Sequence, residues 1–388
     1  MKLVLATSII PDGRQTSGNE IATAAILDSL RRAGVEVVVV GFRWPDSTPE
    51  DPDRTIVLGA VDVKTATASL GTKLRWLAKA VRSNLTFASA KLREMTPESL
   101  RETLAGLEPY DGYVLNSVQL AGAFEDCFRN KPTMFLAQNV EHVTARENAA
   151  ASRSFVQRLL FLREAALLEK LEQRLCSSAR FVFTLSEEDR VALGVEDDRS
   201  VTLPLVARRA PDAPAARPVL YDAALIGTWT WQPNRIGLDW FLEKVVPFLP
   251  ADFSVRIAGS VPDDVSVDRP NIQFVGRVPD AVEFVRGAAM IPLISTSGSG
   301  VQLKTIETFE LGLPSVATRH SLRGVDYLPP NCHVTDDPRE FANAMVATAK
   351  SPQLVDGREF YARQKRLLDA RVRQGLDAMD GTLLERVA

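Results

Sequence analysis

Short apolar runs alternate with amphipathic stretches along the chain. Leu3–Ile10 has the length and apolar composition of a buried β-strand. After a glycine-bearing loop, apolar residues recur at helical spacing from Ile21 to Ala33, and Gly34 ends the predicted helix. A second apolar run covers residues 35–40. This order predicts two parallel strands joined by a right-handed helical crossover.

The same alternation continues to the end of the chain. Further strands are predicted at residues 113–115, 133–137, 181–185 (the last of the first half), 223–227, 254–259, 272–276 and 290–294. Helices are predicted over residues 155–176 and 236–248. Residues 204–218 are rich in Pro and Ala and are typical of an inter-domain linker. We therefore predict an α/β chain of two doubly wound domains, with ligands bound beyond the carboxyl ends of the strands.

Composition narrows the class of protein. The 388 residues suffice for two domains, and 45% hydrophobic with 24% charged residues excludes a disordered or low-complexity chain. A net charge of −3 argues against a surface built for nucleic acid, so we expect no nucleic-acid partner. Three isolated cysteines assemble neither a disulfide framework nor a zinc site. No apolar run is long enough to span a bilayer, and we expect a cytoplasmic protein.

The most informative segment is residues 295–318. A Gly/Ser loop follows a strand and leads into a predicted helix over 301–311, which places Lys304 and Glu307 three residues apart on one side. Unpaired N–H groups at a helix start favour an anion, so a cation for phosphate and a carboxylate for ribose hydroxyls is a natural pairing. An ordinary exposed ion pair is the alternative. The absence of GxxxxGK[ST] and GxGxxG argues against an ATPase or a dinucleotide site.

Four motifs in order resemble one family. The stretch from Gly298 to Pro314 resembles the donor-site signature of GT-B glycosyltransferases of the family 4 type. Residues 225–247 are similar to the start of the donor domain of that family, 164–189 to the end of its acceptor domain, and 274–280 to its loop near the nucleotide base. The resemblance implies two Rossmann-like domains facing each other across a cleft. Their expected bounds are 1–205 for acceptor binding, 206–358 for the donor, and 359–388 for helices crossing back to the first domain.

The same resemblance implies roles for residues of the donor domain. Lys304 would hold the donor diphosphate and Glu307 the ribose. The remaining expected donor-binding residues are Thr228, Arg277, Val278, Gly298, Ser299 and Gly300. The sequence departs from the family pattern at Ser299. Many members carry two glutamates eight positions apart, and here Glu307 would be the second while Ser299 stands in place of the first. It leaves the sugar and the stereochemical outcome open.

In the first domain, polar residues follow the strand at 133–137. Asn139, Glu141 and His142 resemble a stretch common in similar enzymes, and Glu141 or His142 could act as general base if the reaction inverts. Asp12 is a third candidate for this catalytic role. A structural histidine at a strand end is the alternative for His142. The loop from Gly13 to Gly18, with Thr16 and Ser17, resembles the acceptor-side loop, and we expect Gly13, Gly18 and Asn139 to bind the acceptor.

Residues 70–93 combine apolar residues at helical spacing with basic ones and contain no acidic residue. Such a helix can contact an anionic membrane surface, here the inner face of the cell membrane, and the alternative is a solvated helix packed on the first domain.

These features predict a transferase that moves a sugar from a nucleotide-diphosphate sugar to a hydroxyl of a glycan or lipid-linked acceptor, in cell-surface polysaccharide synthesis. We expect no metal and no cofactor beyond this co-substrate. Domain closure about residues 204–218 would exclude water. A sugar-nucleotide epimerase of the same fold and a non-catalytic two-domain binding protein are the alternatives.

Overall fold

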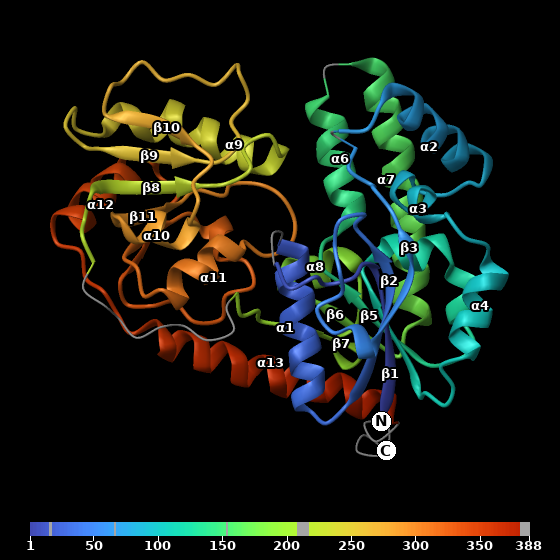
Figure 1. The fold of residues 1–388 in the computed structure, drawn as a ribbon. Coiled ribbons are helices and arrows are strands. Elements are labelled where there is room, and N and C mark those ends of the chain that lie inside the picture. The colour runs from blue at the N-terminus through green and yellow to red at the C-terminus, as the bar shows by residue number, and fades with distance from the viewer. Residues whose placement is uncertain (15–17, 66, 153, 208–216, 381–388) are drawn as a thin grey trace. The chain divides into compact units, whose positions relative to one another are not determined.

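The computed structural model describes residues 1–14, 18–65, 67–152, 154–207 and 217–380 (Figure 1). The chain divides into two compact units. The first is Met1–Leu203 together with the segment from Arg366 on, and the second is Pro204–Lys365. Each unit is built on its own parallel sheet and has its own hydrophobic core.

The sheet of unit 1 has seven strands in the order β3-β2-β1-β4-β5-β6-β7, all paired in parallel. Its strands are β1 (Lys2–Ile9), β2 (Glu36–Arg43), β3 (Thr55–Ala60), β4 (Gly112–Asn116), β5 (Thr133–Ala137), β6 (Phe181–Thr184) and β7 (Ser200–Thr202). Its helices are α1 (Gly18–Arg32), α2 (Leu70–Arg82), α3 (Phe87–Leu92), α4 (Pro97–Ala105), α5 (Val118–Ala123), α6 (Glu141–Ala151), α7 (Phe155–Ser178) and α8 (Glu187–Leu193). Every residue of β4, β5 and β6 is buried, because helices cover both faces of the sheet.

Unit 2 repeats the plan with six parallel strands in the order β10-β9-β8-β11-β12-β13. They are β8 (Tyr221–Ile226), β9 (Val255–Ala258), β10 (Ile272–Gly276), β11 (Ala288–Leu293), β12 (Ser315–Ala317) and β13 (Cys332–Val334). The helices are α9 (Gln232–Trp240), α10 (Ala281–Arg286), α11 (Leu303–Glu310), α12 (Pro338–Lys350) and α13 (Gly357–Met379).

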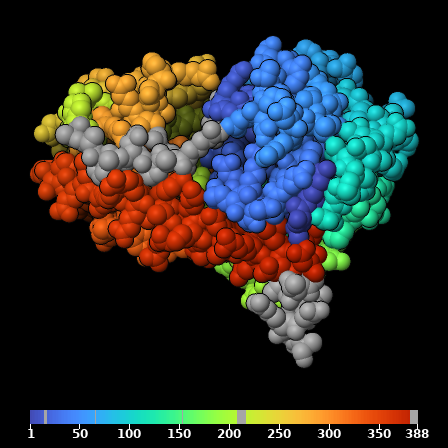
Figure 2. Space-filling view, turned by 60° about the horizontal axis from the view of Figure 1, so that its bottom comes forward, coloured from blue at the N-terminus to red at the C-terminus, as the bar shows by residue number. Residues whose placement is uncertain are grey.

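The later part of α13 packs on unit 1. Asp369 accepts a hydrogen bond from Ser29 Oγ at 2.6 Å and pairs with Arg32 at 2.7 Å, both on α1. Arg371 donates to the carbonyl oxygen of Thr202 on β7 at 2.8 Å. In the space-filling view of Figure 2, the red residues of α13 lie beside blue residues of unit 1. The end of the chain therefore stabilises the first unit.

The prediction of two doubly wound α/β units is confirmed, and several details of it were wrong. The apolar runs missed β3, β7, β12 and β13, and 181–185 is followed by another strand. β7, β12 and β13 have three residues each and are too short to carry a long apolar run. β3 is a partly exposed edge strand whose apolar run, residues 56–61, the prediction overlooked.

Element and unit bounds also differ from the expected ones. The predicted helix over 236–248 begins earlier, at Gln232, and its end is a π-turn followed by a 3₁₀ turn. The units divide after residues 203 and 365, where we expected divisions after 205 and 358, because α13 runs unbroken through the second boundary. Of the predicted linker, residues 208–216 lie outside the described part of the chain.

Candidate active site

The candidate residues of unit 1 lie at the carboxyl edge of its sheet. Asp12 and Gly13 follow β1, and Asn139, Glu141 and His142 follow β5, two strands away in the sheet. Gly18 is the first residue of α1. The predicted loop residues Thr16 and Ser17 lie outside the described residues. The carboxylate of Asp12 is buried, accepts the backbone N–H of Arg14 at 3.0 Å and pairs with the Arg14 side chain at 3.5 Å.

Glu172, on α7, organises the start of α6. Its Oε1 accepts the N–H of Glu141 at 2.7 Å, and its Oε2 lies 2.6 Å from Nδ1 of His142. The side chains of His142 and Glu172 are both buried, and Glu172 is only 1% exposed. Burial raises the pKa of Glu172, while the His142 ring and the helix N–H groups oppose that rise. The carboxylate thus caps α6 and fixes the His142 ring in one orientation.

Glu141 is the first residue of α6, and its carboxyl lies in a poorly solvated place. Burial, followed by repulsion from Glu172, raises the pKa of Glu141 to about 7. Gln119 donates to its Oε1 at 3.2 Å and partly offsets the shift. Near neutral pH this carboxyl therefore exchanges protons, which suits a general acid or base.

A buried polar network, which the sequence did not reveal, fixes these strand ends. Asn116 donates to Thr7 at 3.0 Å and to Thr23 at 2.9 Å, and Gln138 donates to Thr23 at 3.1 Å and to Asn116 at 2.7 Å. Its signal in the sequence is an amide side chain at the end of each of two apolar runs: Asn116 is the last residue of β4, and Gln138 directly follows β5. Satisfied buried networks of this kind rigidify their surroundings.

In unit 2, three neighbouring strands end on glycines that touch each other. The N–H of Gly259 donates to the carbonyl oxygen of Gly276 at 2.7 Å. A Cβ on Gly259 would lie 1.8 Å from the carbonyl oxygen of Gly227, and the φ of Gly259 is +112°. Only glycine fits here, and it lets the loops after β8, β9 and β10 come close together.

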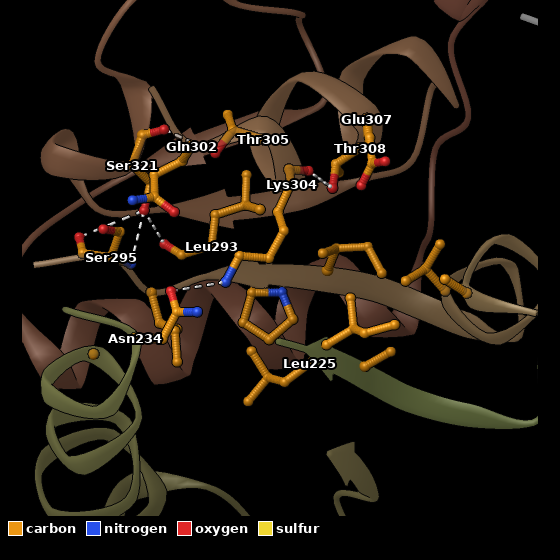
Figure 3. A pocket seen from close by; sticks show the side chains of 18 of the residues that line it. Leu225, Asn234, Leu293, Ser295, Gln302, Lys304, Thr305, Glu307, Thr308 and Ser321 are labelled. Atoms are coloured by element: carbon orange, nitrogen blue, oxygen red, sulfur yellow. Dashed lines mark hydrogen bonds between the residues drawn. The ribbon is translucent and has the colours of Figure 1, made fainter. Parts of the chain in front are cut away.

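A pocket in unit 2 is bounded by β8, α9, α10, β11 and α11 and contains the side chains of Lys304 and Glu307 (Figure 3). Because α11 begins at Leu303, Lys304 lies in its first turn, earlier in the helix than we predicted. Its Nζ donates to Oδ1 of Asn234 at 3.3 Å and lies 5.2 Å from the ring centre of Trp229. The pocket therefore presents an ammonium group at the start of a helix.

Asn234 and Trp229 complete the setting of Lys304. Asn234 also donates to the carbonyl oxygen of Thr228 at 3.1 Å, so it links the loop after β8 to the lysine. The Trp229 indole is 1% exposed and donates to Ala258, so it is a core residue rather than a stacking platform. Burial lowers the pKa of Lys304 to about 8, and Glu307 opposes the shift.

The glycine loop before α11 has the backbone that the sequence suggested. Gly298 and Gly300 have φ of +99° and +76°, and Arg323 donates to the carbonyl oxygen of Gly298 at 2.8 Å. The hydroxyl oxygens of Thr296 and Ser297 are buried and have no hydrogen-bond partner among the described residues. Buried hydroxyls of this kind are suited to a polar ligand at the loop.

The remaining expected donor residues are less enclosed. Thr228 and Arg277 are exposed and Val278 is partly buried, and none of the three lines the pocket, although all follow strands of the same sheet edge. Within the described residues, no group of three or more His, Cys, Asp or Glu side chains could hold a metal ion. Among those same residues, no helix is both long and apolar enough to cross a bilayer.

Comparison with known proteins defines the class. Residues 222–351 match the family model described as Glycosyl transferases group 1. With its two parallel sheets the chain has the GT-B fold, and the match within its second unit identifies it as a glycosyltransferase. This assignment favours the predicted transferase over the epimerase and the binding protein.

Solved structures of glycosyltransferases match nearly the whole chain. TarM matches with a TM-score of 0.61 and 12% identity over 97% of this chain and 98% of its own. The lipopolysaccharide outer core galactosyltransferase WaaB matches with 0.57 and 11%, over 98% and 100%. HepE of Anabaena matches with 0.54 and 13%, over 100% and 98%. At these identities the likeness establishes the fold. A search of curated protein sequences finds no match.

Proposed function

We propose that this glycosyltransferase binds a nucleotide-diphosphate sugar in unit 2 and transfers the sugar to a hydroxyl of a glycan or lipid-linked acceptor held by unit 1, in polysaccharide synthesis. The observation that carries the proposal is the pocket ammonium of Lys304, fixed by Asn234 at the start of α11. A half-buried cation beside helix N–H groups is suited to a diphosphate. HepE, one of the similar structures, was solved with UDP and glucose, which makes UDP the first nucleotide to test.

The proposed reaction replaces one bond of the anomeric carbon by another. The acceptor oxygen forms a bond to the anomeric carbon, the bond from that carbon to the diphosphate oxygen breaks, and the hydroxyl proton passes to a base. Lys304 and the N–H groups of α11 stabilise the charge that develops on the departing diphosphate. Glu307 lines the same pocket, and in this proposal its carboxylate accepts hydrogen bonds from the ribose hydroxyls.

In unit 1, Glu141 and His142 supply the candidate base for an inverting reaction. Asp12 is less suited because its carboxylate is paired with Arg14. Gly13, Gly18 and Asn139 remain the proposed acceptor contacts. The proposed site uses no metal, since the lysine and the helix start supply the positive charge.

A contact of residues 70–93 with an anionic membrane is part of the same proposal. The segment forms two helices, α2 and α3, because Ser83 ends the first and Thr86 caps the second. Lys79, Lys91 and Arg93 bond within the fold, to Glu94, Val63 and Ala123 respectively. In this proposal the other three cations of the segment, Lys73, Arg75 and Arg82, contact the lipid headgroups.

Thermal unfolding with a panel of nucleotide diphosphates and sugar nucleotides tests the donor site. A ligand at 100 times its dissociation constant stabilises the folded chain by about 2.7 kcal/mol. We expect a selective shift that is lost in Lys304→Ala and weakened in Asn234→Ala. Lys244→Ala, in another part of unit 2, is the control. Absence of any shift in the parent protein would refute the donor site, and UDP released only when an acceptor is present would separate transfer from epimerisation.

A further inference from the structure

Exposed apolar side chains gather on two neighbouring helices of unit 1, α2 and the N-terminal part of α7. We call them the α2–α7 surface, and they are Leu70, Leu74, Val81, Phe155, Val156, Leu159, Leu160 and Leu162. Phe155 is 74% exposed and Leu70 is 73% exposed. Exposed apolar residues gathered in this number on neighbouring helices mark an interaction site, whereas single exposed apolar residues are ordinary.

The start of α7 is exposed on all sides. Every residue from Phe155 to Leu160 is exposed, although four of these six residues are large and apolar. From Ala165 onward the same helix packs into the core of unit 1. A helix segment with this many large apolar residues is normally buried, so the exposed start of α7 is unusual.

The two helices form one surface because side chains of α7 tie them together. Arg163 donates to the carbonyl oxygen of Ala80, at the end of α2, at 3.1 Å. Glu164 accepts the N–H of Phe87, at the start of α3, at 2.7 Å. In Figure 1 the first turns of α7 lie at the edge of unit 1, beside α2.

The charges on this surface have one sign. Residues 70–93 and 155–163 contain no acidic residue. Three exposed or half-exposed cations of α2, and one of α7, form no ion pair with any described residue; these are Lys73, Arg75, Arg82 and Arg158. Two copies of such a surface would repel each other, whereas an anionic lipid headgroup layer over an apolar interior complements both its charge and its apolar side chains.

We propose that the first turns of α7, with Leu70, Leu74 and Val81 of α2, insert into the interface of an anionic bilayer while the surrounding cations contact headgroups. The inference rests on the proposed function for its membrane partner, and it adds an inserting element, residues 155–162, outside the basic segment. α6 runs from Glu141 to Ala151 and, at 1.5 Å per residue, spans about 16 Å from the candidate acceptor site toward this surface. A lipid-linked acceptor held in the same bilayer would therefore lie close to Glu141 and His142.

Vesicle flotation of the full chain tests the proposal. The parent protein is expected to float with vesicles of 30% phosphatidylglycerol in phosphatidylcholine and to stay unbound with phosphatidylcholine alone. Phe155→Ser with Leu159→Ser should reduce the bound fraction at least tenfold, as should Arg75→Glu with Arg158→Glu. The control is Val191→Ser with Leu220→Ser, since these side chains are equally exposed but lie outside the surface. It should float like the parent.

Three further measurements distinguish the possible outcomes. Phe155→Trp fluorescence should be quenched by brominated lipid if α7 inserts. Absence of flotation by the parent, or unaltered flotation of the double variants, would overturn the proposal. A parent dimer in solution that Phe155→Ser with Leu159→Ser dissociates would show that a second copy covers the surface. Nucleotide-dependent thermal shifts, measured on the same variants, report on the donor site alone, so failure there would count against the proposed function and not against membrane binding.

Discussion

Glu172 Oε2 lies 2.6 Å from Nδ1 of His142, and the same carboxylate caps the helix that begins at Glu141. A carboxylate at this distance accepts the Nδ1 proton, so the neutral imidazole keeps its lone pair on Nε2. Among the described residues, none forms a hydrogen bond with Nε2. Glu172 is thus a positioning residue that prepares His142 to take a proton at Nε2.

Replacing Glu172 by Gln should lower kcat at least about tenfold, within the range that acid–base catalysis contributes, and leave the KM for the donor unchanged. Nitrogen NMR of the histidine ring should show the Nδ1–H tautomer in the parent and a mixture in the variant. Glu169→Gln is a matched control, because Glu169 also lies on α7 and also bonds to α6, through Arg146 at 2.8 Å, yet does not contact His142. Parent-like kcat and tautomer in Glu172→Gln would contradict the positioning role.

The raised pKa of Glu141 has a consequence for stability. Its pKa is about 7 in the folded chain and about 4.5 when unperturbed, so the folded state binds the extra proton between these values. The stability associated with this carboxyl is therefore present below pH 4.5 and is lost as pH rises through 7. Glu141→Gln should remove this loss and raise the Tm by a few degrees at pH 8, with little change at pH 5. Equal pH dependence in parent and variant would refute it.

The lowered pKa of Lys304 predicts how donor binding depends on pH. With a pKa of about 8, the ammonium group is mostly charged at pH 7 and mostly neutral at pH 9. The affinity for a nucleoside diphosphate should fall by up to about tenfold over this range, because the charged fraction of Lys304 falls about tenfold and a charged hydrogen bond contributes about 1.5–3 kcal/mol. Lys304→Ala should show the weak affinity at every pH, measured by calorimetry. Lys304→Arg should remove the pH dependence, whatever its absolute affinity.

The sequence predicted most of the fold, because a parallel sheet covered on both faces needs continuous apolar runs such as Thr133–Ala137. It missed the three-residue strands, which are too short to carry such a run, and it missed the edge strand β3 although residues 56–61 are all apolar. That Lys304 and Glu307 lie in one pocket could be predicted, because a glycine loop and three-residue spacing are local signals. Glu172 could not, since its partner His142 lies thirty positions away and only folding brings the two together. The exposed start of α7 was also hidden, because its apolar residues look like those of any buried helix.

The contact between Gly259 and Gly227 predicts a large cost for one methyl group. A Cβ on Gly259 would lie 1.8 Å from the carbonyl oxygen of Gly227, in a backbone with φ of +112°. Gly34 has a comparable φ of +85°, but open space surrounds its Cβ position. Gly34→Ala therefore measures backbone strain alone, at about 1–2 kcal/mol, and Gly259→Ala adds a backbone clash that no rotamer relieves. We expect Gly259→Ala to lower the Tm of the donor unit by several degrees more than Gly34→Ala lowers that of unit 1, and to weaken nucleotide binding, because the clash displaces the loop that Asn234 ties to Lys304. Equal losses in the two variants would mean that the glycine contact at the strand ends is loose and does not hold the donor site in shape.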